Sequence, residues 1–145
     1  MFTADAERLQ QLLVEITQVA APPFAEETRS NFVAELWRSA GLAVEQDDLH
    51  NLIAPLPGPS EGPLILLVAH LDTVFSAETD VTVRKESPTK WCAPGIGDNS
   101  ASLAALTYVA EEMVAGNIKP FPARVTLVAT VGEEGLGDLR GAHQI

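Results

Sequence analysis

Apolar residues recur along this chain at helical spacing in three separate segments. In residues 3 to 19, leucine and isoleucine return every three or four positions, which predicts an amphipathic helix with Thr3 at its N-cap. Residues 26 to 40 predict a second helix, and Gly41 directly after it is a typical C-terminal stop. Residues 99 to 115 predict a third helix with the same apolar spacing.

Short apolar runs bounded by turn residues lie between these helices and predict strands. Residues 64 to 69 are continuously apolar and residues 124 to 131 are largely so, as expected of strands that are buried on both faces. Residues 42 to 46 and 51 to 55 predict two further strands, and residues 81 to 85 suit the edge of a sheet. The order of helices and strands indicates an α/β fold with a largely buried sheet.

Composition narrows the possible partners. The chain has 145 residues, 46% hydrophobic and 20% charged, which fits one domain with a sizeable core. Its net charge of -11 argues against nucleic acid as a partner, because phosphates would be repelled. The longest apolar run is too short to span a bilayer, no secretion signal is visible, and one cysteine allows no intrachain disulfide. We therefore expect a cytoplasmic protein with no membrane and no nucleic-acid partner.

Three polar clusters lie where open α/β sheets place their sites, just past a buried strand or at the start of a helix. His70 and Asp72 leave the first buried strand, and residues two apart in a strand point to the same side. Asp98 follows a glycine and is expected at the N-cap of the third helix. Glu133 and Glu134 follow the second buried strand, where adjacent carboxylates are costly unless a cation neutralises them. Each cluster alone has an ordinary structural explanation, but the three together favour a metal site.

The residue types in these clusters match the needs of metal-assisted hydrolysis. Histidine, aspartate and glutamate are ligands that suit zinc, or alternatively cobalt or manganese. A carboxylate beside an imidazole can hold its second nitrogen and raise its basicity as a ligand. A further glutamate can take a proton from water in a site with two metal ions about 3.5 to 4 Å apart.

Three motifs resemble, as a set and in their order along the chain, the metal motifs of a family of dinuclear zinc exopeptidases and amidohydrolases. The motifs are His70-Leu71-Asp72-Thr73-Val74, Gly97-Asp98-Asn99 and Glu133-Glu134-Gly135. The family includes aminoacylases, glutamate carboxypeptidases, tripeptidase T, succinyl-diaminopimelate desuccinylases and carbamoylases. The resemblance covers about residues 5 to 145. It implies the N-terminal half of a zinc-peptidase catalytic domain, a three-layer sandwich around a mixed and mostly parallel sheet.

The resemblance also implies a role for each residue in binding two divalent metal ions, most simply zinc. His70 would bind one ion and Glu134 the other, with Asp98 bridging the two. Asp72 would orient His70. Glu133 would be the general base that activates the bridging water and returns the proton to the leaving amine. The substrate would be a di- or tripeptide or an N-acyl amino acid, and the peptide bond after Asp98 is often cis in this family.

Members of the family continue with a lid and dimerisation domain and then return to the catalytic domain for two more metal ligands. We therefore expect residues 1 to 145 to be only the N-terminal portion of a catalytic domain, with weak metal binding and little hydrolysis by itself. The full-length protein would be a homodimer through the lid domain. His143 is expected to be a surface residue, and His50 and Asp47-Asp48 are expected in a turn.

Other functions remain possible at this point. The segment Gly135-x-Gly137-x-x-x-Gly141 follows a buried strand and precedes a possible helix near Asp138, as in a dinucleotide-binding module. The two glutamates before it would, however, repel a pyrophosphate. A single-domain dinuclear zinc aminopeptidase shares the His, Asp and Glu-Glu order. A non-catalytic binding module is a third alternative, and Cys92 as a nucleophile a fourth, although no base is identified for it.

Overall fold

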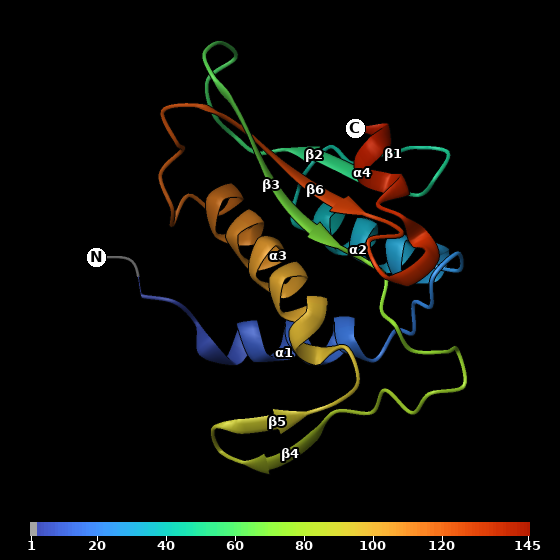
Figure 1. Cartoon of the computed structure of the whole chain (residues 1–145). Coiled ribbons are helices and arrows are strands. Elements are labelled where there is room, and N and C mark those ends of the chain that lie inside the picture. Colours follow the sequence, from blue (N-terminus) through green and yellow to red (C-terminus); the bar gives the residue numbers. More distant parts are fainter. Residues whose placement is uncertain (1–2) are drawn as a thin grey trace.

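The computed structural model describes residues 3–145, and its centre is a four-stranded sheet in the order β1-β2-β6-β3 (Figure 1). The strands are β1 (Glu45–Gln46), β2 (Leu52–Pro55), β3 (Leu64–His70) and β6 (Arg124–Thr130). Strands β3 and β6 are parallel, whereas β2 is antiparallel to both of its neighbours. The α/β class and the mixed sheet are thus confirmed. The parallel pairing of β3 with β6 is the longest of the three, and the two shorter pairings are antiparallel.

All three expected helices form, namely α1 (Ala6–Thr17), α2 (Glu27–Ser39) and α3 (Ala101–Val114). The expected N-cap of α1 is wrong by two positions. The Asp5 carboxylate, not Thr3, accepts hydrogen bonds from the first amides of the helix. An aspartate in this position satisfies amides that have no partner within the helix.

One face of the sheet packs against these three helices and forms the hydrophobic core. Trp37 of α2 is fully buried there, and its indole N–H donates a hydrogen bond of 2.9 Å to the hydroxyl of Thr107 on α3. Alternate residues of β6 point into the same core. These core residues include Leu12, Ile16, Val33, Leu52, Leu71, Leu103, Val125, Leu127, Ala129 and Val131.

The opposite face of β3 is exposed, which corrects two expectations. Leu64, Leu66 and Val68 lie on that face and are 52%, 42% and 54% exposed. Strand β3 is therefore not buried on both faces, although β6 largely is. Three layers were expected. At β3 the described residues form two of them, the sheet and one layer of helices, because no described element covers the second face of this strand.

The expected edge strand near residues 81 to 85 instead forms a separate hairpin of β4 (Arg84–Ser87) and β5 (Lys90–Cys92). Figure 1 shows this hairpin apart from the main sheet, below α1. The pairing is local, and the Lys85 ammonium lies 4.8 Å from the Trp91 ring centre across the two strands. The second strand, β5, is only three residues long and lies between prolines at positions 88 and 94.

Short elements complete the chain. A π-helical turn, η1 (Ile96–Ser100), leads into α3, and a 3₁₀ turn, η2 (Gly135–Gly137), precedes α4 (Arg140–Gln144). The possible helix near Asp138 thus starts two residues later, since Asp138 and Leu139 both have positive φ. Within residues 3–145, no helix combines the length and the apolar character needed to cross a membrane.

Candidate metal centre

His70 is the last residue of β3, and both of its ring nitrogens have partners. It is buried, and its Nδ1 donates a hydrogen bond of 3.0 Å to the main-chain oxygen of Asp72. Its Nε2 lies 2.9 Å from Oδ1 of Asp98. The imidazole is therefore fixed on one side by backbone and offers its other nitrogen to an acidic side chain. This is the arrangement expected of a histidine that ligates a metal through Nε2.

Asp72 is fully buried and connects the two strand ends. Its carboxylate accepts hydrogen bonds from the amides of Glu133, at 3.0 Å, and Glu134, at 2.8 Å. The distance from its Oδ1 to Nδ1 of His70 is 3.7 Å. The role predicted for Asp72 concerned the imidazole alone. In the structure its main-chain oxygen holds the imidazole, while its carboxylate holds the backbone that carries the glutamate pair.

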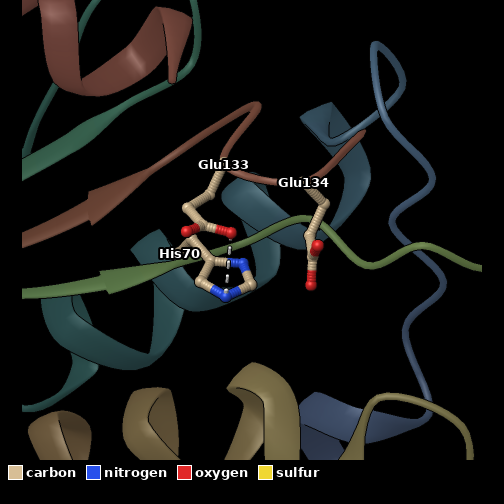
Figure 2. A group of neighbouring side chains, drawn as sticks. All are labelled: His70, Glu133 and Glu134. Atoms are coloured by element: carbon tan, nitrogen blue, oxygen red, sulfur yellow. Dashed lines mark ion pairs between the residues drawn. The ribbon is translucent and has the colours of Figure 1, made fainter. Parts of the chain in front are cut away.

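Glu133 and Glu134 lie in the loop that follows β6, next to the end of β3 because the two strands are parallel neighbours. One ligand atom from each glutamate and from His70 can be chosen such that all three lie within 4.8 Å of one another. Figure 2 shows the Glu133 carboxylate against the imidazole, with its Oε2 3.8 Å from Nε2. The Glu134 side chain extends beside them from the same loop.

Asp98 reaches the site from η1 and is 76% exposed. It was expected at the N-cap of the third helix, and this is wrong. Its backbone is extended, α3 begins three residues later, and Ser100 precedes the helix. The Asp98-Asn99 peptide bond is cis, as the resemblance implied. The Asp98 carboxylate contacts His70 rather than the helix amides.

The charges at the site act on one another. Burial alone would lower the pKa of His70, but its contacts with Asp72 and Asp98, with the charge of Glu133, raise it to about 9. Burial would raise the pKa of Asp72, yet its bonds to His70 and to the two amides hold it below its usual range. The pKa of Glu134 is raised, first by burial and then by the charges of Asp98 and Glu133.

These residues fit a divalent metal. Imidazole nitrogens and carboxylate oxygens are both ligand types that zinc takes in catalytic sites. A proton bridges Nε2 of His70 and Oδ1 of Asp98, which are 2.9 Å apart, and the charges of Asp98 and Glu133 add to burial in raising the pKa of Glu134, so the carboxylates repel one another. A metal ion would relieve that repulsion and displace the proton. The cluster brings together all five residues singled out in the sequence.

Arg29 supports the site and was not anticipated. It is fully buried on α2, and its guanidinium donates to the main-chain oxygens of Val19, at 2.6 Å, and Leu71, at 3.0 Å. Burial lowers its pKa to about 10, partly offset by the charge of Asp72. Leu71 lies between the two functional residues at the end of β3. An arginine in an amphipathic helix is ordinarily a surface residue, so no local pattern singles out Arg29.

The remaining candidates have ordinary structural roles. His143 is exposed, as expected, and the Asp47 carboxylate accepts bonds from the amides of Leu49 and Asn51 in the turn before β2. Cys92 is a free, half-buried thiol on β5.

Two of the three glycines of the supposed dinucleotide motif, Gly137 and Gly141, serve internal packing. A Cβ on Gly137 would collide with the backbone of Gly132, and one on Gly141 would collide with Asn51 and Val131. The glycines are therefore needed to bring the loop against its own chain, and the five-residue α4 offers no phosphate site.

Comparison with known proteins agrees with this geometry. A curated protein of Pyrococcus abyssi, named as a LysW-lysine/LysW-ornithine hydrolase, is 33% identical over 135 residues, which are 93% of this chain and 35% of that protein. The uncharacterized protein YfbL of Escherichia coli is 28% identical over 119 residues, 74% of this chain and 34% of that protein. The chain thus spans about a third of the length of the curated relatives it matches.

Solved structures give the same picture. A tripeptidase from Staphylococcus aureus superimposes with a TM-score of 0.77 at 26% identity, covering 97% of this chain and 40% of that one. Aminopeptidase PepT from Bacillus cereus superimposes with a TM-score of 0.79 at 24% identity and the same coverage. The expected resemblance to tripeptidases is confirmed. The model of Peptidase family M28 matches residues 51–145, a range that contains all five site residues, and the chain belongs to this family.

Proposed function

We propose that this chain supplies part of a dinuclear metal centre that hydrolyses a peptide or amide bond in a small substrate. The observation that carries the proposal is the convergence of His70, Glu133 and Glu134 within 4.8 Å, with Asp98 on the remaining nitrogen of the imidazole. Residues from both strand ends and from η1 meet at this point. Membership in a peptidase family supports the reaction class.

Each side chain has a distinct task in this proposal. His70 and Glu134 would each hold one of two divalent ions, most simply zinc, and Asp98 would lie between the ions. Metal ions at such a site supply Lewis acidity that lowers the pKa of water and polarises the scissile carbonyl group. Asp72 fixes the geometry in two ways. Its main-chain oxygen holds the imidazole, and its carboxylate holds the loop that carries Glu133 and Glu134, called the glutamate loop below.

Glu133 is the general base in this proposal. Its carboxylate is 44% exposed and lies beside the imidazole, so a water molecule and a substrate can both reach it. It would take a proton from the attacking water and return it to the nitrogen of the leaving amine. Its neighbour Glu134 extends beside it from the same loop, with an oxygen within 4.8 Å of a nitrogen of His70, and would act as a ligand.

The substrate class follows from the relatives. Their names describe a tripeptidase, an aminopeptidase, an aminoacylhistidine dipeptidase from Vibrio alginolyticus and a hydrolase of LysW-lysine or LysW-ornithine. A di- or tripeptide or an N-acyl amino acid shares the amide bond that these names have in common. We propose further that the complete protein contains the remaining metal ligands and a lid domain through which it forms a homodimer.

A single-domain aminopeptidase is the second candidate. An aminopeptidase from Desulfurococcus kamchatkensis superimposes with a TM-score of 0.70, and this chain covers 56% of it, a larger share than of the tripeptidases. Such an enzyme requires a free amino terminus on its substrate. Parallel assays with dipeptides, tripeptides and N-acyl amino acids separate the two candidates, because N-acyl amino acids lack that amine.

Metal binding and turnover of the complete gene product test the assignment of the two glutamates. Glu133→Gln is expected to keep its zinc content and lose about 10²- to 10⁴-fold in turnover, the usual contribution of a general base. Glu134→Gln is expected to lose one of two zinc ions by mass spectrometry. The exposed Glu61 precedes β3, whereas His70 ends that strand, so Glu61→Gln gives the matched control. Unchanged zinc content and turnover in both site variants would contradict the proposal.

A further inference from the structure

A buried ion pair joins the segment before α2 to the segment after the glutamate loop. Nη2 of Arg140 lies 2.7 Å from each carboxylate oxygen of Glu26, and the two residues are 114 positions apart. The Glu26 side chain is 4% exposed and the Arg140 side chain 23%. Glu26 also accepts a hydrogen bond of 3.1 Å from the amide of Phe24, whose ring centre lies 4.6 Å from the Arg140 guanidinium carbon.

The same guanidinium packs against the residue that precedes the glutamate pair. Gly132 is buried, has a φ of +63°, and leaves no space for a Cβ, which would collide with Nη1 and other atoms of Arg140. Nη1 is buried, with no hydrogen-bond partner among residues 3–145. The position of Nη1 is therefore set by packing against Gly132 and by the ion pair between Arg140 and Glu26, rather than by a hydrogen bond of its own.

We propose that the Glu26–Arg140 pair is a positioning device for Glu133 and Glu134, an inference that rests on the metal-dependent function proposed above. The glutamate loop is held from two sides. The buried carboxylate of Asp72 binds the amides of Glu133 and Glu134 from the β3 side. The Arg140 guanidinium blocks movement of the loop at Gly132 from the other side, and Glu26 fixes the guanidinium.

A second connection fixes the start of α4, which carries Arg140. The Asn51 side chain donates to the main-chain oxygen of Gly141, at 3.2 Å, and accepts from the amide of Val131, at 3.0 Å. The amide of Gly141 in turn donates to the main-chain oxygen of Val131, at 3.0 Å. Arg140 thus projects from a backbone that is itself tied to the end of β6, so its guanidinium can transmit the position of Glu26 to the loop.

Stability alone is a poor reason for such a pair. Removing two charges from water offsets much of their attraction, so a buried pair contributes little net stability compared with apolar residues of similar size. Two hydrogen bonds from one guanidinium nitrogen to both oxygens of a carboxylate do, however, fix its place. The exposed Arg38–Glu35 pair on α2 has the same residue types and no such surroundings, which makes it the matched comparison.

Amide hydrogen exchange of the metal-free 145-residue chain tests the inference directly. The variants are Arg140→Met, Glu26→Gln and their combination, with Arg38→Met as control. Exchange at the Glu133 and Glu134 amides is expected to accelerate about tenfold in each single variant, and no further in the double variant, because the pair acts as a unit. Exchange at Leu127, in the middle of β6, is expected to change less.

A purely structural pair would behave differently. If exchange at Glu133 and Glu134 is unchanged, or accelerates only in step with Leu127, the positioning role is contradicted. Arg140→Lys covers the case in which Arg140→Met fails to fold, because lysine keeps the charge but cannot offer the same planar guanidinium to Glu26 and Gly132. It is expected to accelerate the same two amides by a smaller factor.

Zinc affinity separates a failure of this inference from a failure of the proposed function. In competition with a chromophoric chelator, the Arg140 and Glu26 variants are expected to bind zinc about three- to tenfold more weakly than the wild type, and Arg38→Met equally well. A wild-type chain that binds no zinc would count against the metal centre itself. The exchange rates would then still decide whether the pair holds the loop.

Discussion

The candidate site has a buried half and an exposed half, and they differ in how they are held. At the end of β3, His70 and Asp72 are buried, with hydrogen bonds to backbone that are complete without a metal. Around them, Asp98 and Glu133 are exposed and Glu134 is half-buried, and the charges of Asp98 and Glu133 repel that of Glu134. The buried half is part of the folded framework, whereas the exposed half reaches that framework through side-chain contacts with the imidazole of His70.

This contrast explains why the five residues should respond differently to substitution. Groups in the buried half have lost their hydration and depend on their protein partners, so removing one leaves others unsatisfied. Groups in the exposed half keep water as an alternative partner. Substitutions in the buried half should therefore lower the stability of the fold. Substitutions in the exposed half should weaken metal binding and leave the fold intact.

The largest effect is expected for Asp72→Asn. This change removes a buried charge that serves His70 and two loop amides, and it should lower the free energy of unfolding by about 3–5 kcal/mol. Urea denaturation of the metal-free chain measures it. Asp98→Asn is the control from the exposed half, with an expected cost below about 1 kcal/mol. Equal costs for the two variants would show that the halves do not differ.

The next effect is a dependence of stability on pH. The folded pKa of His70, about 9, lies above that of an unfolded histidine, about 6.5. The protonated imidazole therefore contributes stability that is fully present below about pH 6.5 and is lost as pH rises through about 9. Urea denaturation of the metal-free chain should show a loss on the order of 3 kcal/mol across this range.

His70→Gln is the control for that pH dependence, because it removes the titrating group. Its free energy of unfolding should be lower than that of the wild type at pH 6.5 and nearly flat up to pH 9. A wild-type curve as flat as that of the variant would mean that the imidazole is not held protonated by its acidic neighbours.

Gly132→Ala is expected to cost about 1–3 kcal/mol, because a side chain at positive φ is strained and its Cβ would push the Arg140 guanidinium away. Gly135→Ala is a sharp control, since Gly135 also has positive φ, +54°, but open space around it. The difference between the two free energies of unfolding isolates the collision with Arg140. If the two variants are equally stable, Arg140 does not press on the loop.

The smallest effect on stability is expected for Glu134→Gln in the metal-free chain. Burial raises the pKa of this carboxyl, and the charges of Asp98 and Glu133 raise it further, so neutralising it relieves a repulsion. The free energy of unfolding should change by less than about 0.5 kcal/mol or rise slightly. Thermal denaturation without zinc measures this change in stability. The same measurement with zinc tests the role of Glu134 as a ligand, because zinc should stabilise the wild type more than the variant. A large loss in the metal-free chain would assign Glu134 to the framework.

Much of the site could be predicted because it depends on local patterns. His70 and Asp72 follow one apolar strand, and Glu133 and Glu134 follow another. Parallel neighbouring strands bring their carboxyl ends to the same edge of a sheet, so these residues meet once the two strands pair. The type of each element is also local, since the helical spacing of α1, α2 and α3 is set by their own apolar residues.

Other features could not be predicted, because they depend on residues far apart in the chain. No short-range pattern distinguishes Glu26 and Arg140 from ordinary surface charges, yet they form a buried pair. The exposure of one face of β3 depends on what covers it, and an apolar sequence cannot report that. The separate β4–β5 hairpin likewise reflects where the loop before η1 packs.

The sequence by itself determined which residues are candidates for the chemistry, because ligand type and position at strand ends are properties of short segments. Only the tertiary structure decided how the buried half is assembled, with the Asp72 carboxylate on two loop amides, Arg29 on the backbone of Leu71, and Arg140 against Gly132. The contacts of Asp72 and Arg29 join residues that are 42 to 62 positions apart, and the Glu26 carboxylate that holds Arg140 is 114 positions away from it. Buried polar groups must find such partners wherever the chain brings them, and that requirement is met only in the folded state.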